Sequence, residues 1–118
     1  MSEQTRQQIL AEVRAAIDAY EADFMGEIID VYLADAPKRL DDLRAAHASG
    51  DRQGFTRAAH TLKSSSSYVG AKRFAELAAA IERASPDAAG ADLAGQIARL
   101  EQEYVHVKAA LEEVRSGS

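Results

Sequence analysis

Apolar residues recur at helical spacing along most of the chain, in stretches separated by short breaks that contain Gly, Ser, Asp or Pro. Residues three or four apart share one face of an α-helix, so each stretch presents an apolar face that another element must cover. We expect helices over residues 3–17, 21–49, 52–68 and 71–84, and from residue 92 to the C-terminal tail. Abundant Ala, Leu, Glu and Arg, which are strong helix formers, agree with this pattern.

The length of 118 residues fits one domain with a single core, spanning residues 1–118. Short connections between long amphipathic helices favour antiparallel neighbours. We therefore predict an all-α fold: an antiparallel up-down four-helix bundle with its core over residues 19–115, and an additional short N-terminal helix over residues 3–17. Pro37 lies inside the second helical stretch, where it either kinks the helix or breaks it into two collinear helices.

Charge and composition exclude several classes of protein. The formal net charge of −5 argues against a nucleic-acid binder, which needs a basic face. The chain has no cysteine, which excludes disulfides and thiolate metal sites and fits a reducing compartment. The polar N-terminus lacks the apolar core of a signal peptide, and no apolar run approaches the roughly 20 residues of a membrane span. We expect a soluble, monomeric, cytoplasmic protein with no membrane partner, free-standing from its Met1 start.

His60 is expected on the polar face of the helix over residues 52–68. With Phe55 set at 0°, an advance of about 100° per residue defines an apolar stripe within about 60° of it. The members of that stripe are Ala58, Ala59, Leu62, Ser66 and Val69. His60 falls at about 140° and should therefore face water.

The residues around His60 favour phosphoryl chemistry. Neutral imidazole is a good nucleophile near neutral pH, so an exposed His60 can accept a phosphoryl group. The transferred oxygens need charge compensation, which Lys63 and Arg57 could supply from nearby positions of the helix. Ser64 and Ser67 are small and leave a clearing for another protein surface. A serine run lowers helix propensity, and this local cost favours a functional interpretation.

The stretch AAHTLKSSSSYVGA at residues 58–71 resembles the H-x-L-K-G-S-S-x-x-x-G-A signature of histidine-containing phosphotransfer (HPt) domains. The similarity extends to residues 24–51, which look like that family's second helix, and to residues 74–82, which look like its next one. The resemblance implies an antiparallel four-helix bundle whose histidine accepts phosphate from an aspartate of one receiver domain and passes it to an aspartate of another.

Carried over to this chain, the resemblance implies that His60 is the phosphoacceptor, through the ring nitrogen remote from the backbone. Lys63 then aids the phosphorylated state. Glu82 matches a polar position, often glutamine, that can hydrogen-bond the other ring nitrogen and orient the ring. Ser64 stands where the family commonly has glycine, so we expect docking to survive with an altered partner preference.

The resemblance also implies the partners, which are response-regulator receiver domains and a hybrid sensor histidine kinase. Magnesium belongs to the receiver, so the chain needs no cofactor of its own. A phosphate loop of the G-x-x-x-x-G-K-S/T type does not occur in the sequence, and we expect a phosphoryl carrier rather than an autonomous ATP-dependent kinase. For docking, we predict that the receiver covers His60 through Ile9 and Val13 of the leading helix, together with Lys63 and Ser64.

Two other interpretations compete with the phosphoryl carrier. A non-catalytic adaptor bundle could bind a receiver or kinase without phosphotransfer, or dimerise through its first helix. A metalloenzyme is disfavoured because His47, His60 and His106 show neither the H-E-x-x-H spacing nor a helical i, i+4 pair.

Overall fold

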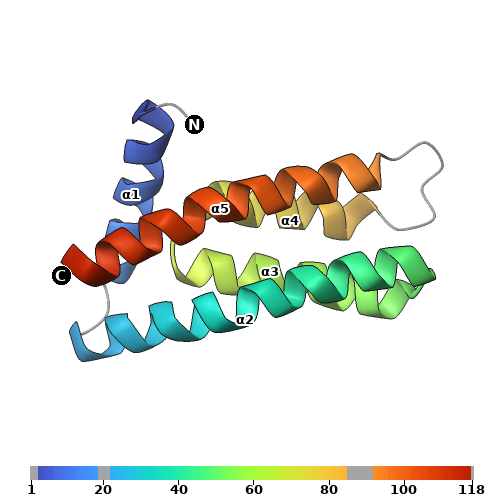
Figure 1. Cartoon of the computed structure of the whole chain (residues 1–118), viewed down its shortest axis with the longest axis horizontal. Coiled ribbons are helices and arrows are strands. Elements are labelled where there is room, and N and C mark those ends of the chain that lie inside the picture. Colours follow the sequence, from blue (N-terminus) through green and yellow to red (C-terminus); the bar gives the residue numbers. More distant parts are fainter. Residues whose placement is uncertain (1–2, 19–21, 85–91, 118) are drawn as a thin grey trace.

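The computed structural model describes residues 3–18, 22–84 and 92–117, and in these ranges the chain is helical without any strand. The helices are α1 (Glu3–Ile17), α2 (Ala22–Ser49), α3 (Arg52–Tyr68), α4 (Lys72–Ala84) and α5 (Leu93–Gly117). Helices α2 to α5 run alternately in opposite directions, and α1 stands across one end of them (Figure 1). The predicted fold class is confirmed. Residues 1–2, 19–21, 85–91 and 118 of the predicted domain and its core lie outside the described residues.

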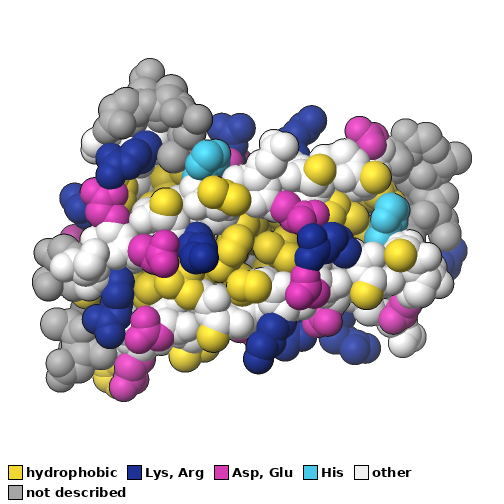
Figure 2. All heavy atoms as spheres, viewed as in Figure 1, with side chains coloured by type: hydrophobic (Ala, Val, Ile, Leu, Met, Phe, Trp, Pro, Cys, Tyr) yellow, Lys and Arg dark blue, Asp and Glu magenta, His cyan; other side chains and the backbone are white. Residues whose placement is uncertain are grey.

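Helices α2 to α5 close into a ring around one core. Helix α2 packs on α3, α3 on α4, α4 on α5, and α5 on α2, while α1 packs on α5. The largest fully buried side chains come from all five helices and include Val13, Ile29, Leu43, Phe55, Leu62, Phe74, Ile81, Leu100 and Leu111. Apolar side chains follow the seam between helices in Figure 2, with charged side chains on either side. No described helix is apolar over a stretch long enough to cross a lipid bilayer.

Helix α2 continues through Pro37, so the prediction of a possible break resolves in favour of one helix. Proline removes one backbone donor, a cost that tertiary packing can offset. The packing is continuous here, because Ala36 and Leu40, on either side of Pro37, are both buried. Pro37 itself is exposed. The core face of α2 therefore extends without interruption along the bundle.

Helix α3 begins and ends at residues whose types define those boundaries. The Asp51 side chain accepts a hydrogen bond from the Gly54 backbone N–H at 3.0 Å, as an N-cap should. At the other end Gly70 has φ +78°, in the left-handed region that glycine adopts without steric cost. Asp51 and Gly70 therefore set where α3 begins and where it ends.

A buried hydrogen bond between Tyr32 and Ser66 joins α2 to α3. The two hydroxyl oxygens lie 2.7 Å apart, and neither side chain is exposed. Burial raises the pKa of the Tyr32 phenol, which stays neutral and can donate or accept here. A buried polar pair is satisfied in only one arrangement of the helices, so it fixes how α3 is rotated against α2. That rotation turns the opposite side of α3 to the solvent.

Candidate functional site

His60 lies on the solvent face of α3, and 58% of its side chain is exposed. The residues on the opposite face of the helix, Phe55, Ala59 and Leu62, are fully buried. This arrangement confirms the exposed position that helical periodicity predicts for His60. The side chain is within reach of another protein, and the helix that carries it is held firmly by its buried face.

Glu82 of α4 connects His60 with Lys63. Glu82 Oε2 lies 2.9 Å from His60 Nδ1, and Glu82 Oε1 accepts a hydrogen bond from Lys63 Nζ at 2.9 Å. The hydrogen bond from Lys63 lowers the pKa of Glu82 below its ordinary value, and the one from His60 acts in the same direction, while partial burial opposes them. Glu82 is therefore ionised at neutral pH and holds both side chains of α3 at once.

The charge on Glu82 decides which nitrogen of His60 carries the proton. An ionised carboxylate can only accept hydrogen bonds, so the imidazole must donate Nδ1–H to it. In the neutral ring, Nε2 then keeps its lone pair. Nε2 is the nitrogen remote from the backbone, and it is available to a reacting group. The Glu82 contact thus holds the ring in one tautomer and one orientation.

Arg57 and Ser64 lie on the exposed side of α3 with His60, whereas the hydroxyl of Ser67 is turned to its own helix. Arg57 and His60 share a surface hollow with Glu82 and with Arg52, Gln53 and Thr56 of the first turns of α3. Ser67 Oγ donates a hydrogen bond to the Lys63 carbonyl oxygen at 2.9 Å. Ser64 is exposed and small, so the space beyond His60 along the helix stays open.

The prediction that Ile9 and Val13 form part of the docking surface is wrong. Both side chains are buried in the core, where α1 packs against the end of the bundle. Their helical spacing indicates an apolar face on α1, but an apolar face that covers a core is no longer available to a partner. Figure 1 shows α1 lying across that end of the bundle.

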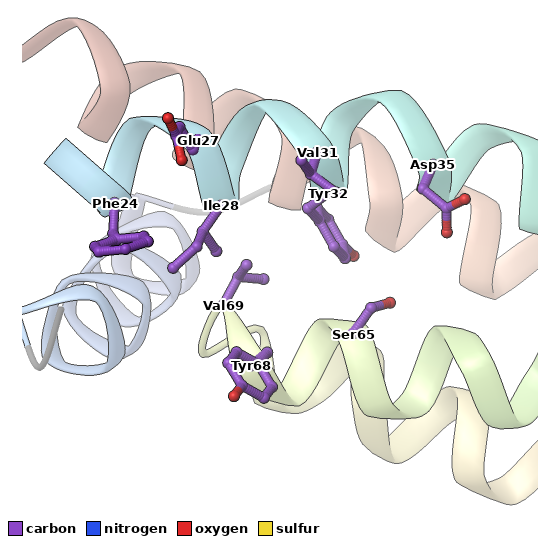
Figure 3. Close-up of a pocket in the computed structure, with 9 residues that line it drawn as sticks. All are labelled: Phe24, Glu27, Ile28, Val31, Tyr32, Asp35, Ser65, Tyr68 and Val69. Atoms are coloured by element: carbon purple, nitrogen blue, oxygen red, sulfur yellow. The ribbon is translucent and has the colours of Figure 1, made fainter.

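An apolar groove between α2 and α3 was missed by the sequence analysis. Phe24 and Val31 of α2 and Tyr68 of α3 are large apolar side chains that remain largely exposed. They line a groove together with Ile28 and Val69, and Glu27 and Asp35 lie at its rim. Figure 3 shows Ile28 reaching toward α3 and Val69 reaching toward α2 across the groove.

The signal for this groove is present in the sequence but is easily misread. Phe24, Val31 and Tyr32 all belong to the apolar pattern of the second helix. Adjacent residues differ by about 100° around a helix, so Val31 and Tyr32 cannot both point at the same core. The structure buries Tyr32 and leaves Val31 67% exposed.

Metal binding finds no support in the geometry. Within residues 3–18, 22–84 and 92–117, no group of three or more His, Cys, Asp or Glu side chains could hold an ion. His47 lies beside Phe55 at the far end of α2, with ring centroids 6.2 Å apart. The one cluster of titratable side chains around His60 is a hydrogen-bonded Glu–Lys–His set, which suits positioning of an imidazole.

Comparisons with known proteins show the family and the fold of the chain. The family model described as "Hpt domain" matches residues 27–117. A crystal structure of histidine-containing phosphotransfer protein B (HptB) from Pseudomonas aeruginosa PAO1 is similar to the chain, with a TM-score of 0.77 and 24% sequence identity. That similarity covers 94% of this chain and 93% of the other, and it shows a shared fold. A search of curated proteins found no match.

Proposed function

The chain belongs to the Hpt domain family, and we propose that His60 is its phosphoacceptor, taking a phosphoryl group from the aspartate of one receiver domain and passing it to the aspartate of another. The observation that carries this proposal is the contact between His60 Nδ1 and Glu82 at 2.9 Å, which leaves Nε2 with its lone pair on an exposed helix face.

The proposed transfer is a displacement at phosphorus. The Nε2 lone pair attacks the phosphorus of an aspartyl phosphate, an N–P bond forms, and the P–O bond to the aspartate breaks. The aspartate leaves as a carboxylate, and the ring, which keeps its Nδ1–H, becomes cationic. Glu82 lies against that proton and compensates the new charge. The reverse displacement by a second aspartate returns the ring to its neutral form.

Lys63 supports the phosphorylated state from one turn beyond His60. In the free chain its ammonium is hydrogen-bonded to Glu82 at 2.9 Å. A flexible lysine can shift from this carboxylate toward phosphoryl oxygens that appear on the neighbouring ring. The magnesium ion that aids the reaction would sit on the receiver. The charged side chains around His60 are those of Lys63, Arg57 and Glu82, and two cations with one carboxylate make a poor site for a divalent cation.

Glu82→Ala is expected to lower the rate of phosphoryl transfer to His60 by roughly tenfold, because orienting partners of a reactive imidazole have effects of that size. Glu82→Gln keeps an oxygen that accepts the Nδ1–H bond and should retain most of the rate. Single-turnover transfer kinetics measure the rates, and ¹⁵N NMR of the imidazole reports the tautomer. Equal rates in wild type and Glu82→Ala, with an unchanged Nδ1–H tautomer, would show that Glu82 does not position the imidazole of His60.

The receiver is proposed to dock over the groove lined by Phe24, Ile28, Val31 and Tyr68. His60, Ser64 and Tyr68 follow one another at i, i+4 and i+8 along α3, so they form one exposed stripe. Tyr68 therefore lies about 12 Å from His60 along the helix axis, within the footprint of a small domain. Ser64 is the small residue between them. This groove, rather than Ile9 and Val13, is therefore proposed to supply the apolar contact with the receiver.

Val31→Asp should weaken binding of a cognate receiver about tenfold, because a charge enters the centre of an apolar contact. Val105→Asp is the matched control, since Val105 on α5 is 62% exposed and Val31 is 67% exposed. Both variants should retain the melting temperature of the wild type. Isothermal titration of receiver into each chain gives the dissociation constants. A Val31→Asp chain that binds as well as Val105→Asp would place the docking surface elsewhere.

A direct experiment on the central proposal is transfer of radiolabelled phosphate from a phosphorylated receiver domain to the chain. The label should be acid-labile and alkali-stable, as a phosphohistidine is, and it should depend on His60.

A further inference from the structure

Helix α3 has a charge opposite in sign to that of the whole chain. The chain carries a formal net charge of −5. Helix α3 has three basic residues, Arg52, Arg57 and Lys63, and no Asp or Glu. A partner that meets this helix therefore meets local positive charge on an otherwise acidic protein.

Arg57 is the cation of this helix that remains available beside His60. It precedes His60 by three residues, so both side chains lie on neighbouring exposed positions, and both line the same surface hollow. Lys63 occupies the matching position on the other side of His60, but its ammonium is bound to Glu82. Arg57 forms no ion pair or hydrogen bond with any residue in the described ranges.

Two arginines of α2, in contrast, are engaged in ion pairs. Arg39 pairs with Asp35 and Asp42 along α2, and Arg44 pairs with Glu101 across the bundle. These pairs lie within the protein surface and leave little net charge for a partner. The guanidinium of Arg57 keeps its full donor set, which fits a carboxylate in a bidentate arrangement.

We infer that Arg57 contacts the acidic rim of the receiver's phosphorylation site and sets how fast, and in which orientation, the receiver docks. This inference rests on the proposed function of His60. A receiver that holds magnesium beside its aspartate must carry carboxylates there, because magnesium takes oxygen ligands. Those carboxylates come close to His60 during transfer, since the aspartyl phosphate must reach Nε2.

The two sides of His60 then differ in chemistry. Toward the start of α3 lies the hollow with Arg57, and toward its end lies the groove with Tyr68 and Val31. A receiver with acidic groups on one side of its aspartate and an apolar surface on the other can bind in only one orientation. Opposite charges also accelerate encounter, and salt screens the effect.

Arg57→Gln tests the inference, with Arg99→Gln as the matched control. Arg99 is an exposed arginine at the junction of α4 and α5, outside the proposed docking surface, and its replacement changes the net charge equally. Stopped-flow association with a receiver is measured from about 50 mM to about 500 mM NaCl, together with single-turnover transfer at saturating receiver. We expect Arg57→Gln to lower the association rate about fivefold to tenfold at low salt, with the difference fading at high salt.

Three results separate the possibilities. If Arg57→Gln and Arg99→Gln show the same salt dependence while the wild type takes label on His60, the inference fails and the proposed function stands. If Arg57→Gln lowers the saturated transfer rate without changing association, Arg57 contacts the transferring phosphoryl group, and the docking role is overturned. If the wild type takes no label from any receiver that it binds, the proposed function fails first.

Discussion

Replacement of His60 by Gln is expected to abolish phosphoryl labelling of the chain. Glutamine has similar size and can hydrogen-bond Glu82, but it has no ring nitrogen that can form an N–P bond. The fold should be unaffected, because the His60 side chain is 58% exposed and the buried face of α3 is unchanged. The loss should therefore be complete, while binding of the receiver persists.

The measurement uses a radiolabelled receiver, followed by acid and alkali treatment of the labelled chain. His47→Gln and His106→Gln are the controls, and both should take label like the wild type. Unlike His60, neither histidine is hydrogen-bonded to a carboxylate of the residues that the structure describes. Label that survives in His60→Gln would contradict the phosphoacceptor assignment. A wild-type chain that binds receivers and never takes label would instead favour the adaptor function.

Gly70→Ala is expected to destabilise the fold by roughly 2–4 kcal/mol. Gly70 has φ +78°, where an L-residue costs about 1 kcal/mol. A Cβ at this position would also lie 2.5 Å from the Glu12 carbonyl oxygen and 2.7 Å from Ala16 Cβ. Those atoms belong to α1, so the methyl group must push α1 away from the turn between α3 and α4.

Gly50→Ala separates the two contributions, because Gly50 has φ +73° and a Cβ there meets nothing within 4 Å. It should cost only the backbone term of about 1 kcal/mol. Urea unfolding of both variants gives the free energies, and the melting temperature of Gly70→Ala should fall by more than about 8 °C. Equal destabilisation by the two substitutions would show that α1 is not held closely against Gly70.

Much of the fold follows from local pattern. The buried residues of α3 and α4 occur at the spacing that the sequence predicts, and Asp51 and Gly70 bound α3 as their residue types suggest. The exposure of His60 follows from the same periodicity, since 100° per residue fixes which side of the helix opposes Phe55. Only the effect of Pro37 stayed open, because its outcome depends on core packing along α2 rather than on the proline alone.

Other features depended on which helices meet. Glu82 lies 22 positions beyond His60, and only the packing of α4 on α3 brings its carboxylate to Nδ1 and to Lys63. The family resemblance pointed to Glu82, and the structure supplies the geometry. Ile9 and Val13 were expected at the docking surface because their side of α1 is apolar, whereas the structure uses that side to close the core.

The sequence by itself determined the helices, their buried faces, and the solvent-facing position of His60 on α3, because these depend on interactions within a few residues. The tertiary structure decided that Glu82 fixes the imidazole, that α1 is part of the core, and that Phe24, Val31 and Tyr68 stay uncovered between α2 and α3. Those outcomes depend on how helices distant in sequence pack together. Helical periodicity shows that an apolar face exists, and only the packed bundle shows what covers it.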